Sequence, residues 1–470
     1  MPTRIVCCIA FMIAACGPSV RENGGDDTSG SCDPGDTRTC YSGQDGTKGV
    51  GPCKEGKTTC DPSGVWGPCG GEVVPTGENC ADGVDNNCNG ATDEDEDKDG
   101  DGITTCAGDC CDSTECSDPK LVNAGAFDAP GNLVDDDCDG AIDNTALLCD
   151  QGLSSGSTTP LDYAKAMDLC QTTSMADKKW GVISATLTLA DGTGMPAPKG
   201  HAIRSKFGTN VLPKGGTAMA VLSTGAAAGK GDSNPAYQSF QDTPAPGNNK
   251  QSAFPADFVA ANGNKLPNAP GCPQPSGANA RDPVMLTLTI RVPTNAKSFK
   301  LDTNFFSSEF PEYTCSPFND FFVVLLDSVY MGSPANPTDK NLAFYSPAGS
   351  TMKYPVGVNL ASGNTGLFTQ CVNGRVGCAQ FGNGTITTCT STTDLAGTGF
   401  DNADPGTCDA NSLEGGGTGW LQTSGNVMPG EIIKLRIAIW DTSDHVLDSL
   451  ALVDAFTWSV ELSQPGTVIF

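Results

Sequence analysis

The sequence predicts an all-β protein in which a jelly-roll-like β-sandwich follows a disulfide-rich region dominated by loops. Apolar and polar residues alternate in several short segments after residue 146, as they do in strands that bury one face. Most cysteines precede that point and lie among Gly, Pro and Thr. Acidic residues concentrate there too, because residues 78–143 hold 20 acidic and 2 basic residues, a net charge of −18 out of −28.

Residues 1–15 have the features of an export signal peptide. Arg4 gives a positive start, and residues 5–14 form an apolar run that is too short to span a bilayer. The run ends in Ile-Ala-Ala-Cys16, which resembles the bacterial lipobox. This resemblance implies lipidation of Cys16, and Gly17 in place of an aspartate implies retention at the outer membrane. An ordinary signal peptide that is cleaved elsewhere is the alternative.

Cysteine usage indicates an exported protein independently of the signal. Residues 16–31 are rich in Gly, Ser and Asp and are expected to form a flexible tether. Residues 32–77 carry five cysteines and hardly an aliphatic residue, so cross-links must hold this module together. The chain has 14 cysteines between Cys32 and Cys170 and 6 between Cys272 and Cys408, even numbers that fit disulfide pairing within each region. A zinc protein would need Cys-x-x-Cys pairs or more than two histidines.

Residues 78–145 form an acidic module in which Asp-x-[Asp/Asn]-x-[Asp/Asn]-Gly occurs three times. Alternate residues of such a loop place side-chain oxygens on one side, and glycine at the sixth position permits a sharp turn. Calcium takes six to eight oxygen ligands, so we expect calcium as the cofactor. The expected ligands are Asp85, Asn87, Asn89, Asp93 and Glu96 in loop 1, Asp97, Asp99, Asp101, Asp109 and Asp112 in loop 2, and Asp135, Asp137, Asp139 and Asp143 in loop 3.

The three loops differ in how completely they supply ligands. Loop 1 satisfies the twelve-residue EF-hand pattern through Glu96, although a cysteine-rich turn flanks it in place of helices. Loop 2 has Gly108 at position 12, so Asp109 or Asp112 must complete its ligand shell. Loop 3 has Ala146 at that position and is the weakest of the three. The alternative is a solvated acidic spacer, which would need neither the regular glycines nor the interleaved cysteines.

The segments CDPGDTRTCYSG, GVGPCKEGKTTC and CADGVDNNCNGATDE resemble a metal-binding motif named for a copper-associated surface protein of methanotrophs. The resemblance covers residues 32–143, and within it loop 2 looks like a thrombospondin type 3 repeat. The family name implies copper, but this region contains no histidine and no methionine. Carboxylate and carbonyl oxygens suit calcium instead, so we reject copper for this chain.

Residues 146–470 have the composition of a globular β domain. Helical spacing of apolar residues predicts a helix over residues 160–170. Strands are expected over residues 180–189, 284–292, 321–326, 433–439 and 457–462. Long connections rich in Gly, Pro and Asn favour a two-sheet sandwich over a βαβ fold.

The segments FGTNVLPKGGTAMAVLSTG, FFSSEFPEYTCSPFNDFFVVLLD and LRIAIWDTSDHVLDSLALVDAFTW resemble the choice-of-anchor L domain of bacterial surface proteins. The resemblance covers residues 150–465. It implies an exported, β-rich domain of unsettled molecular function, with the lipid on Cys16 as the surface anchor of this chain.

Two acidic loops of the β domain are weaker candidates for a metal site, and their residues are Glu309, Asp320, Asp441, Asp444 and Asp448. Capping of turns explains the same residues without a ligand, and catalysis would need two carboxylates on either side of a substrate. The chain has no nucleophile elbow, phosphate-binding loop, dinucleotide fingerprint or His-Glu-x-x-His helix. We therefore expect that the protein is not an enzyme.

Together these features predict a bacterial outer-membrane lipoprotein, exposed at the cell surface, in which a calcium-stabilised stalk presents a β-sandwich for adhesion or envelope assembly. The expected partners are the membrane, through the lipid anchor, and a surface glycan or protein ligand. Nucleic acid is not expected, because the chain has no cluster of Lys and Arg. The alternatives are a surface hydrolase that acts on polysaccharide or peptide through the loop carboxylates, and a purely structural envelope protein.

Overall fold

The computed structural model describes residues 32–80, 82–93, 95, 97–112, 118–143, 148–241, 249–380, 384–403 and 406–469. The expected signal peptide over residues 1–15, the tether over 16–31 with Cys16, and Glu96 lie outside these ranges. The chain divides into two compact units, with the division after Pro119.

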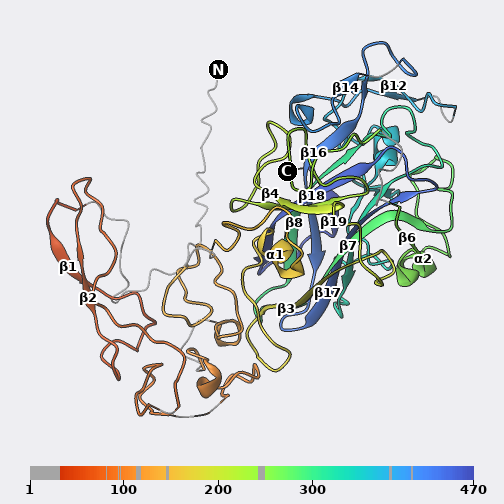
Figure 1. Ribbon diagram of the computed structural model, residues 1–470. Helices are drawn as coiled ribbons and strands as arrows, with labels where there is room; N and C mark the ends of the chain where they lie inside the picture. Colours follow the sequence, from red (N-terminus) through yellow and green to blue (C-terminus); the bar gives the residue numbers. More distant parts are fainter. Residues whose placement is uncertain are drawn as a thin grey trace, which may run out of the picture. The chain divides into compact units, whose positions relative to one another are not determined.

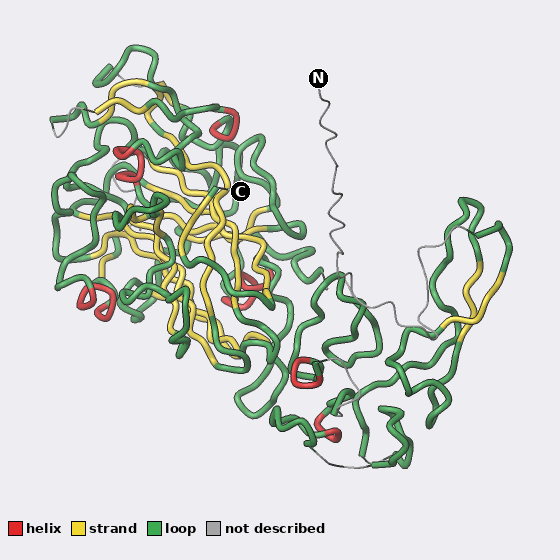
Figure 2. Tube along the Cα trace, turned by 180° about the vertical axis from the view of Figure 1, so that it is seen from behind, coloured by secondary structure: helices red, strands yellow, loops and turns green. Residues whose placement is uncertain are grey.

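The first unit is built mainly from loops that disulfides hold together (Figures 1 and 2). Its two strands, β1 (Thr37–Cys40) and β2 (Gly56–Thr59), pair antiparallel, and a short 3-10 helix, η1, spans Thr105–Ala107. The buried apolar side chains described in this unit are six cysteines and Ile103. Its disulfides include those that join Cys32 to Cys60, Cys40 to Cys69, Cys53 to Cys88 and Cys80 to Cys106. Cross-links therefore take the place of an apolar core, as the sequence predicted.

The second unit contains two antiparallel sheets and several small two-stranded ones (Figure 1). The six-stranded sheet has the order β19-β16-β8-β18-β5-β4, and the other sheet has the order β3-β7-β17-β9 with β6 paired to β7. The strands of the six-stranded sheet are β4 (His201–Arg204), β5 (Met219–Ser223), β8 (Ser298–Ser307), β16 (Gly416–Asn426), β18 (Ser449–Ser459) and β19 (Gly466–Val468). Those of the five-stranded sheet are β3 (Gly181–Thr188), β6 (Gln251–Ser252), β7 (Ala280–Arg291), β9 (Phe321–Asp327) and β17 (Ile432–Thr442).

The remaining elements are short. The small sheets pair β10 (Phe344–Tyr345) with β11 (Tyr354–Pro355), β12 (Gly374–Val376) with β13 (Gly384–Ile386), and β14 (Asn402–Ala403) with β15 (Leu413–Glu414). The α-helices are α1 (Pro160–Lys165) and α2 (Ala256–Ala261), and the other 3-10 helices are η2 (Pro119–Leu121), η3 (Val358–Gly363) and η4 (Thr393–Leu395). The predicted all-β class is therefore confirmed.

The two large sheets pack face to face around the main apolar core. Buried residues of both sheets belong to this core, including Leu286 and Ile437 from the five-stranded sheet and Leu301 and Ala451 from the six-stranded sheet. Two further clusters cover the outer faces. Phe207 and Phe400 pack outside the six-stranded sheet, and Phe258 of α2 packs outside the five-stranded sheet. Strands that are buried on both faces need no polar alternation, which explains the continuous apolar runs in β5 and β9.

The structure differs from the predicted elements at several places. Helix α1 ends at Lys165, five residues before the predicted end, and α2 was not predicted. Strand β8 was missed because it is buried almost throughout. Strand β16 was missed because it consists mainly of Gly and polar residues, although its burial alternates. Strand β18 spans Ser449–Ser459, where residues 457–462 were predicted.

Residues 120–143, which include loop 3, belong to the second unit and are attached to the β-sandwich near the end of β7. The Phe127 N–H donates to Asn295 Oδ1 at 3.0 Å, and Asn295 Nδ2 donates to the Phe127 carbonyl at 2.8 Å. The Thr294 hydroxyl donates to Asn123 Oδ1 at 2.7 Å. The acidic segment expected over residues 78–145 is thus shared between the two units.

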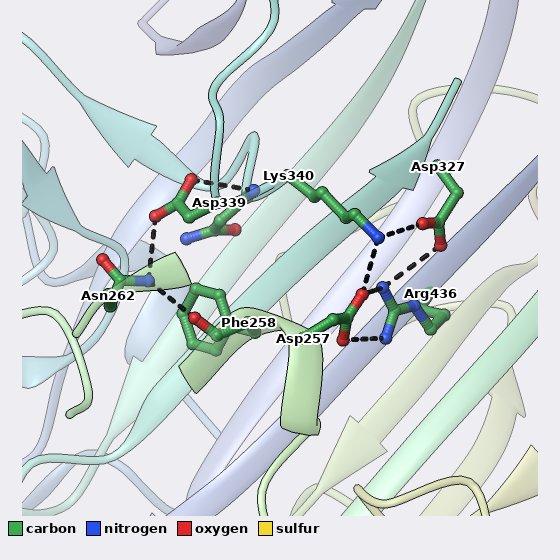
Figure 3. Close-up of polar contacts among 8 residues, drawn as sticks. Asp257, Phe258, Asn262, Asp327, Asp339, Lys340 and Arg436 are labelled. Atoms are coloured by element: carbon green, nitrogen blue, oxygen red, sulfur yellow. Dashed lines mark hydrogen bonds and ion pairs between the residues drawn. The ribbon is translucent and has the colours of Figure 1, made fainter. Parts of the chain in front are cut away.

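A network of ion pairs attaches α2 to the outer face of the five-stranded sheet (Figure 3). Arg436 of β17 donates to Asp257 of α2 through Nη1 at 2.9 Å and Nη2 at 2.6 Å, and to Asp327 at 3.1 Å. Lys340 donates to Asp257 at 2.7 Å and also pairs with Asp327. The hydrogen bonds from Arg436 and Lys340 hold the pKa of Asp257 below its usual range, against a smaller opposing effect of burial.

Removing this network should loosen α2 and lower stability. Because charge-assisted hydrogen bonds are stronger than neutral ones but this network is partly exposed, we expect Arg436→Met to lower the free energy of unfolding by about 1–2 kcal/mol in chemical denaturation at pH 7. Lys434→Met, on the same face of β17, is the matched control and should change it little. A carboxylate whose pKa is lower in the folded than in the unfolded chain stabilises the fold at pH values above its unfolded pKa, which is about 4 for aspartate. The loss of stability caused by Asp257→Asn should therefore shrink as the pH falls below 4. Equal losses in Arg436→Met and Lys434→Met would contradict this role.

Candidate metal centres

All three Asp-Gly loops share one pattern of hydrogen bonds between side chains and backbone. The aspartate at position 1 accepts the N–H of the glycine at position 6 in each loop, at 3.0 Å, 3.2 Å and 2.9 Å. The side chain at position 3 accepts a hydrogen bond from the backbone N–H of position 5. The side chain at position 5 accepts one from the backbone N–H of position 7. The glycines Gly90, Gly102 and Gly140 have φ of 93°, 92° and 90°, a conformation that favours glycine. The spacing in the sequence therefore produces the same local turn three times.

Loops 1 and 3 are structural copies of each other, 50 residues apart in the sequence. Asp93 accepts the Gly83 N–H at 3.1 Å, and the equivalent Asp143 accepts the Leu133 N–H at 3.2 Å. Asp143 also accepts the N–H of Gly131 at 2.8 Å. The carboxylates at position 9 are therefore bonded to the preceding turn, a role that sequence reasoning missed. The 50-residue repeat of Val-Asp-[Asn/Asp]-[Asn/Asp]-Cys was the signal that could have revealed the shared arrangement.

Loop 2 gathers the largest group of carboxylates. Ligand oxygens of Asp97, Asp99 and Asp101 lie within 4.8 Å of one another, and so do those of Asp99, Asp109 and Asp112. The sequence required Asp109 or Asp112 to complete this loop, and the structure brings both to Asp99.

Two of the three carboxylates in the second group of loop 2 are buried. Asp109 is fully buried and Asp112 is 6 % exposed. One oxygen of each of Asp99, Asp109 and Asp112 is buried without a hydrogen-bond partner among the described residues. Burial, followed by the charges of Asp101, Asp99 and Asp112, raises the pKa of Asp109 to about 8. A hard divalent cation would satisfy these oxygens and offset their repulsion.

Loops 1 and 3 offer different sets of oxygens. In loop 3 the oxygens of Asp135, Asp137 and Asp139 lie within 4.8 Å of one another, and burial raises the pKa of Asp135 to about 7 and that of Asp137 to about 6. Loop 1 combines one carboxylate, Asp85, with the amides of Asn87 and Asn89. The ranking of loop 1 first and loop 3 last relied on position 12, where Glu96 and Ala146 both lie outside the described ranges. The structure directs the Asp93 carboxylate of loop 1 toward the backbone of Gly83.

A fourth group of carboxylates lies inside the β-sandwich. The pairing of β9 with β17 joins Phe321 to Trp440, which places Asp320 opposite Asp441. Glu309 follows the end of β8, and oxygens of the three residues lie within 4.8 Å of one another. Their exposed fractions are 2 % for Glu309 and Asp441 and 0 % for Asp320.

The electrostatics of this buried group are unfavourable when all its members are charged. Burial, followed by neighbouring carboxylates, raises the pKa of Glu309 and of Asp441 well above the usual range. Burial also raises the pKa of Asp320 to about 7, although the Asp441 carboxyl and the Ser449 hydroxyl oppose this rise.

Asp444 and Asp448, the other two residues predicted for this site, lie outside the group of three carboxylates. Asp448 accepts a hydrogen bond from the Thr224 hydroxyl at 3.3 Å. Asp444 accepts the Val446 N–H at 3.0 Å, which is the turn-capping role that the sequence left open.

Access to solvent limits what the buried group can do. A cavity of about 750 Å³ lies over β3, β7, β17 and α2, and a second of about 510 Å³ lies near β10 and β19. Neither is lined by Glu309, Asp320 or Asp441. The arrangement can therefore hold a small cation, whereas a polysaccharide or peptide would have no path to these carboxylates through either cavity.

Within the described ranges, no helix has the length and apolar character needed to cross a membrane. Comparisons of the chain with protein-family models, curated proteins and solved structures give no match. The two family resemblances therefore stay predictions.

The buried carboxylates of loop 2 predict that the effect of Asp109→Asn on the stability of the first unit differs between chelator and calcium. In chelator the substitution removes a buried carboxyl whose raised pKa destabilises the fold at neutral pH, so the first unit should unfold at the same or a higher temperature than the parent. In calcium it removes a ligand, so calcium affinity measured by titration calorimetry should fall about tenfold, because affinity follows the ligand charge.

Asp36→Asn is the matched control, since Asp36 is exposed in the same unit, and it should leave both quantities unchanged. A loss of stability by Asp109→Asn that is equal in calcium and in chelator would contradict a metal role for loop 2.

Proposed function

We propose that this chain is a bacterial outer-membrane lipoprotein in which calcium-bound loops rigidify a stalk and present the β-sandwich at the cell surface for adhesion or envelope assembly. The observation that carries the proposal is the turn shared by the three Asp-Gly loops, together with the buried carboxylates of Asp109 and Asp112 in loop 2, each of which has one oxygen without a hydrogen-bond partner among the described residues. A solvated spacer would have no reason to bury carboxylates. Calcium fits the oxygen-only ligand set better than zinc or copper.

The state of the cysteines supports export. All 19 cysteines in the described ranges form disulfides, and the six in the C-terminal region pair among themselves, as Cys272 with Cys315, Cys371 with Cys389 and Cys378 with Cys408. Disulfides persist in oxidising compartments outside the cytosol. The lipid anchor on Cys16 rests on the lipobox resemblance alone.

The burial of Glu309, Asp320 and Asp441 speaks against the hydrolase alternative. A glycosidase holds its two carboxylates on either side of a bound sugar, so they must be reachable by the substrate. These three residues are at most 2 % exposed. We therefore favour a binding or assembly role over catalysis.

Protease treatment of intact cells that display the full chain tests the location and the calcium dependence together. In calcium the first unit should resist cleavage, and chelator should increase the cleavage rate at least tenfold, because carboxylate repulsion then loosens the loops. Cells expressing Cys16→Ser should release the chain into soluble fractions. Retention of that variant at the membrane, or equal cleavage with and without calcium, would contradict the proposal.

The presenting role predicts calcium-dependent binding by the same cells. Displaying cells should bind a glycan panel or partner cells in calcium and lose most of that binding in chelator or with Asp99→Asn plus Asp109→Asn. Asp36→Asn is the control and should bind like the parent. Turnover of a polysaccharide or peptide that Glu309→Gln abolishes would instead establish the hydrolase.

A further inference from the structure

We propose that Glu309, Asp320 and Asp441 form a structural site for a hard divalent cation, of the size and preference of calcium, inside the β-sandwich. This site is separate from the Asp-Gly loops and does not depend on the stalk. Its residues come from two regions that are distant in the sequence, one with Glu309 and Asp320 and the other with Asp441.

Burial without partners is the first observation that points to a ligand. Glu309 Oε2, both carboxylate oxygens of Asp320 and Asp441 Oδ1 are buried and lack a hydrogen-bond partner among the described residues. Buried charges in proteins are almost always paired or bound to metal. Within the same ranges, no Lys, Arg or His forms an ion pair with any of the three. One carboxylate oxygen from each of the three residues also lies within 4.8 Å of the others, which is the arrangement that one ion can bridge.

The surroundings fit an oxygen-liganded cation. His445, the nearest histidine in the sequence, is paired with Asp282 through Nδ1, so imidazole is not offered to the group. The Ser449 hydroxyl is also buried without a hydrogen-bond partner and is close enough to Asp320 to affect its pKa. Carboxylate and hydroxyl oxygens suit calcium, magnesium or manganese and do not favour zinc or copper.

The position of the group indicates what a bound cation would do. Glu309 follows β8 and Ser449 begins β18, both in the six-stranded sheet. Asp320 precedes β9 and Asp441 lies in β17, both in the five-stranded sheet. A cation at this point would cross-link the two sheets at one end of the sandwich and close the segment 308–320, which the Cys272–Cys315 disulfide also restrains.

The alternative is a proton-sharing carboxyl cluster without a metal. The two explanations differ in how calcium changes the effect of a neutral substitution. If a cation is bound, Glu309→Gln removes a ligand and costs stability only when calcium is present. If protons are shared, the effect of the substitution is the same in calcium and in chelator.

The test uses the full chain carrying Asp135→Asn and Asp139→Asn as the parent, so that loop 3 does not contribute to the second unit. Thermal unfolding is followed by tryptophan fluorescence, to which the second unit contributes four of the five tryptophans, including the buried Trp440. Calcium at about a hundredfold above its dissociation constant should raise the transition of this parent by roughly 5 °C, and Glu309→Gln should lose that rise. Asp302→Asn is the matched control, because Asp302 is a buried carboxylate of β8 outside the group, and it should keep the calcium-dependent rise.

Native mass spectrometry provides a readout that does not depend on stability. The parent should carry one calcium ion more than the Glu309→Gln variant, and Asp441→Asn replaces that variant if Glu309→Gln fails to fold. Equal ion counts, or an equal calcium-dependent shift in the parent and in the variant, would overturn the proposal. A calcium shift that survives Glu309→Gln but vanishes in Asp302→Asn would overturn it as well.

Discussion

Carboxylates held close together are the constraint on which much of this structure depends. In loop 2, in loop 3 and inside the β-sandwich, groups of three acidic residues have oxygens within 4.8 Å of one another. Two unit charges at that distance repel by roughly 3 kcal/mol at an effective dielectric constant of about 20. Disulfides and the repeated side-chain to backbone hydrogen bonds keep the loops in place despite this repulsion. A bound calcium ion would remove the repulsion itself.

The two units meet the same constraint by different means. Among its described residues, the first unit has hardly any buried apolar side chain besides its cysteines. Its acidic loops therefore rely on cross-links such as Cys53–Cys88, which ends within loop 1. The second unit has a large core between two sheets and additional apolar layers outside both of them. A core of that size can hold Asp320 and Asp441 opposite each other in paired strands. Disulfides therefore hold the acidic loops of the first unit in place, whereas apolar packing holds the carboxylates inside the β-sandwich.

Local features were predictable from the sequence, and features that depend on distant segments were not. The spacing of Asp85, Asn87 and Gly90 was enough to predict a calcium-type turn, because each hydrogen bond in it joins residues at most five positions apart. The alternation of apolar and polar residues predicted β7 and β17, because this pattern also lies within a short stretch of the sequence. By contrast, β8 is buried on both faces, so it lacks the alternating pattern.

The sites show the same distinction. Asp93 and Asp143 were predicted as ligands from their position in the motif, but their carboxylates bond turns that lie ten residues earlier in the chain. The meeting of Glu309 with Asp320 and Asp441 depends on the register of β9 against β17 and on how the two sheets pack. Neither the register of the strands nor the packing of the sheets can be read from a single sequence, although all three residues were among the predicted metal ligands.

The central claim is that these acidic groups hold calcium, and diffraction at a long X-ray wavelength tests it most directly. Crystals of the chain grown in calcium should show anomalous difference peaks between Asp99, Asp109 and Asp112, within loop 3, and between Glu309, Asp320 and Asp441. Crystals soaked in chelator should lose them. Absence of anomalous density at these positions in saturating calcium would contradict the account.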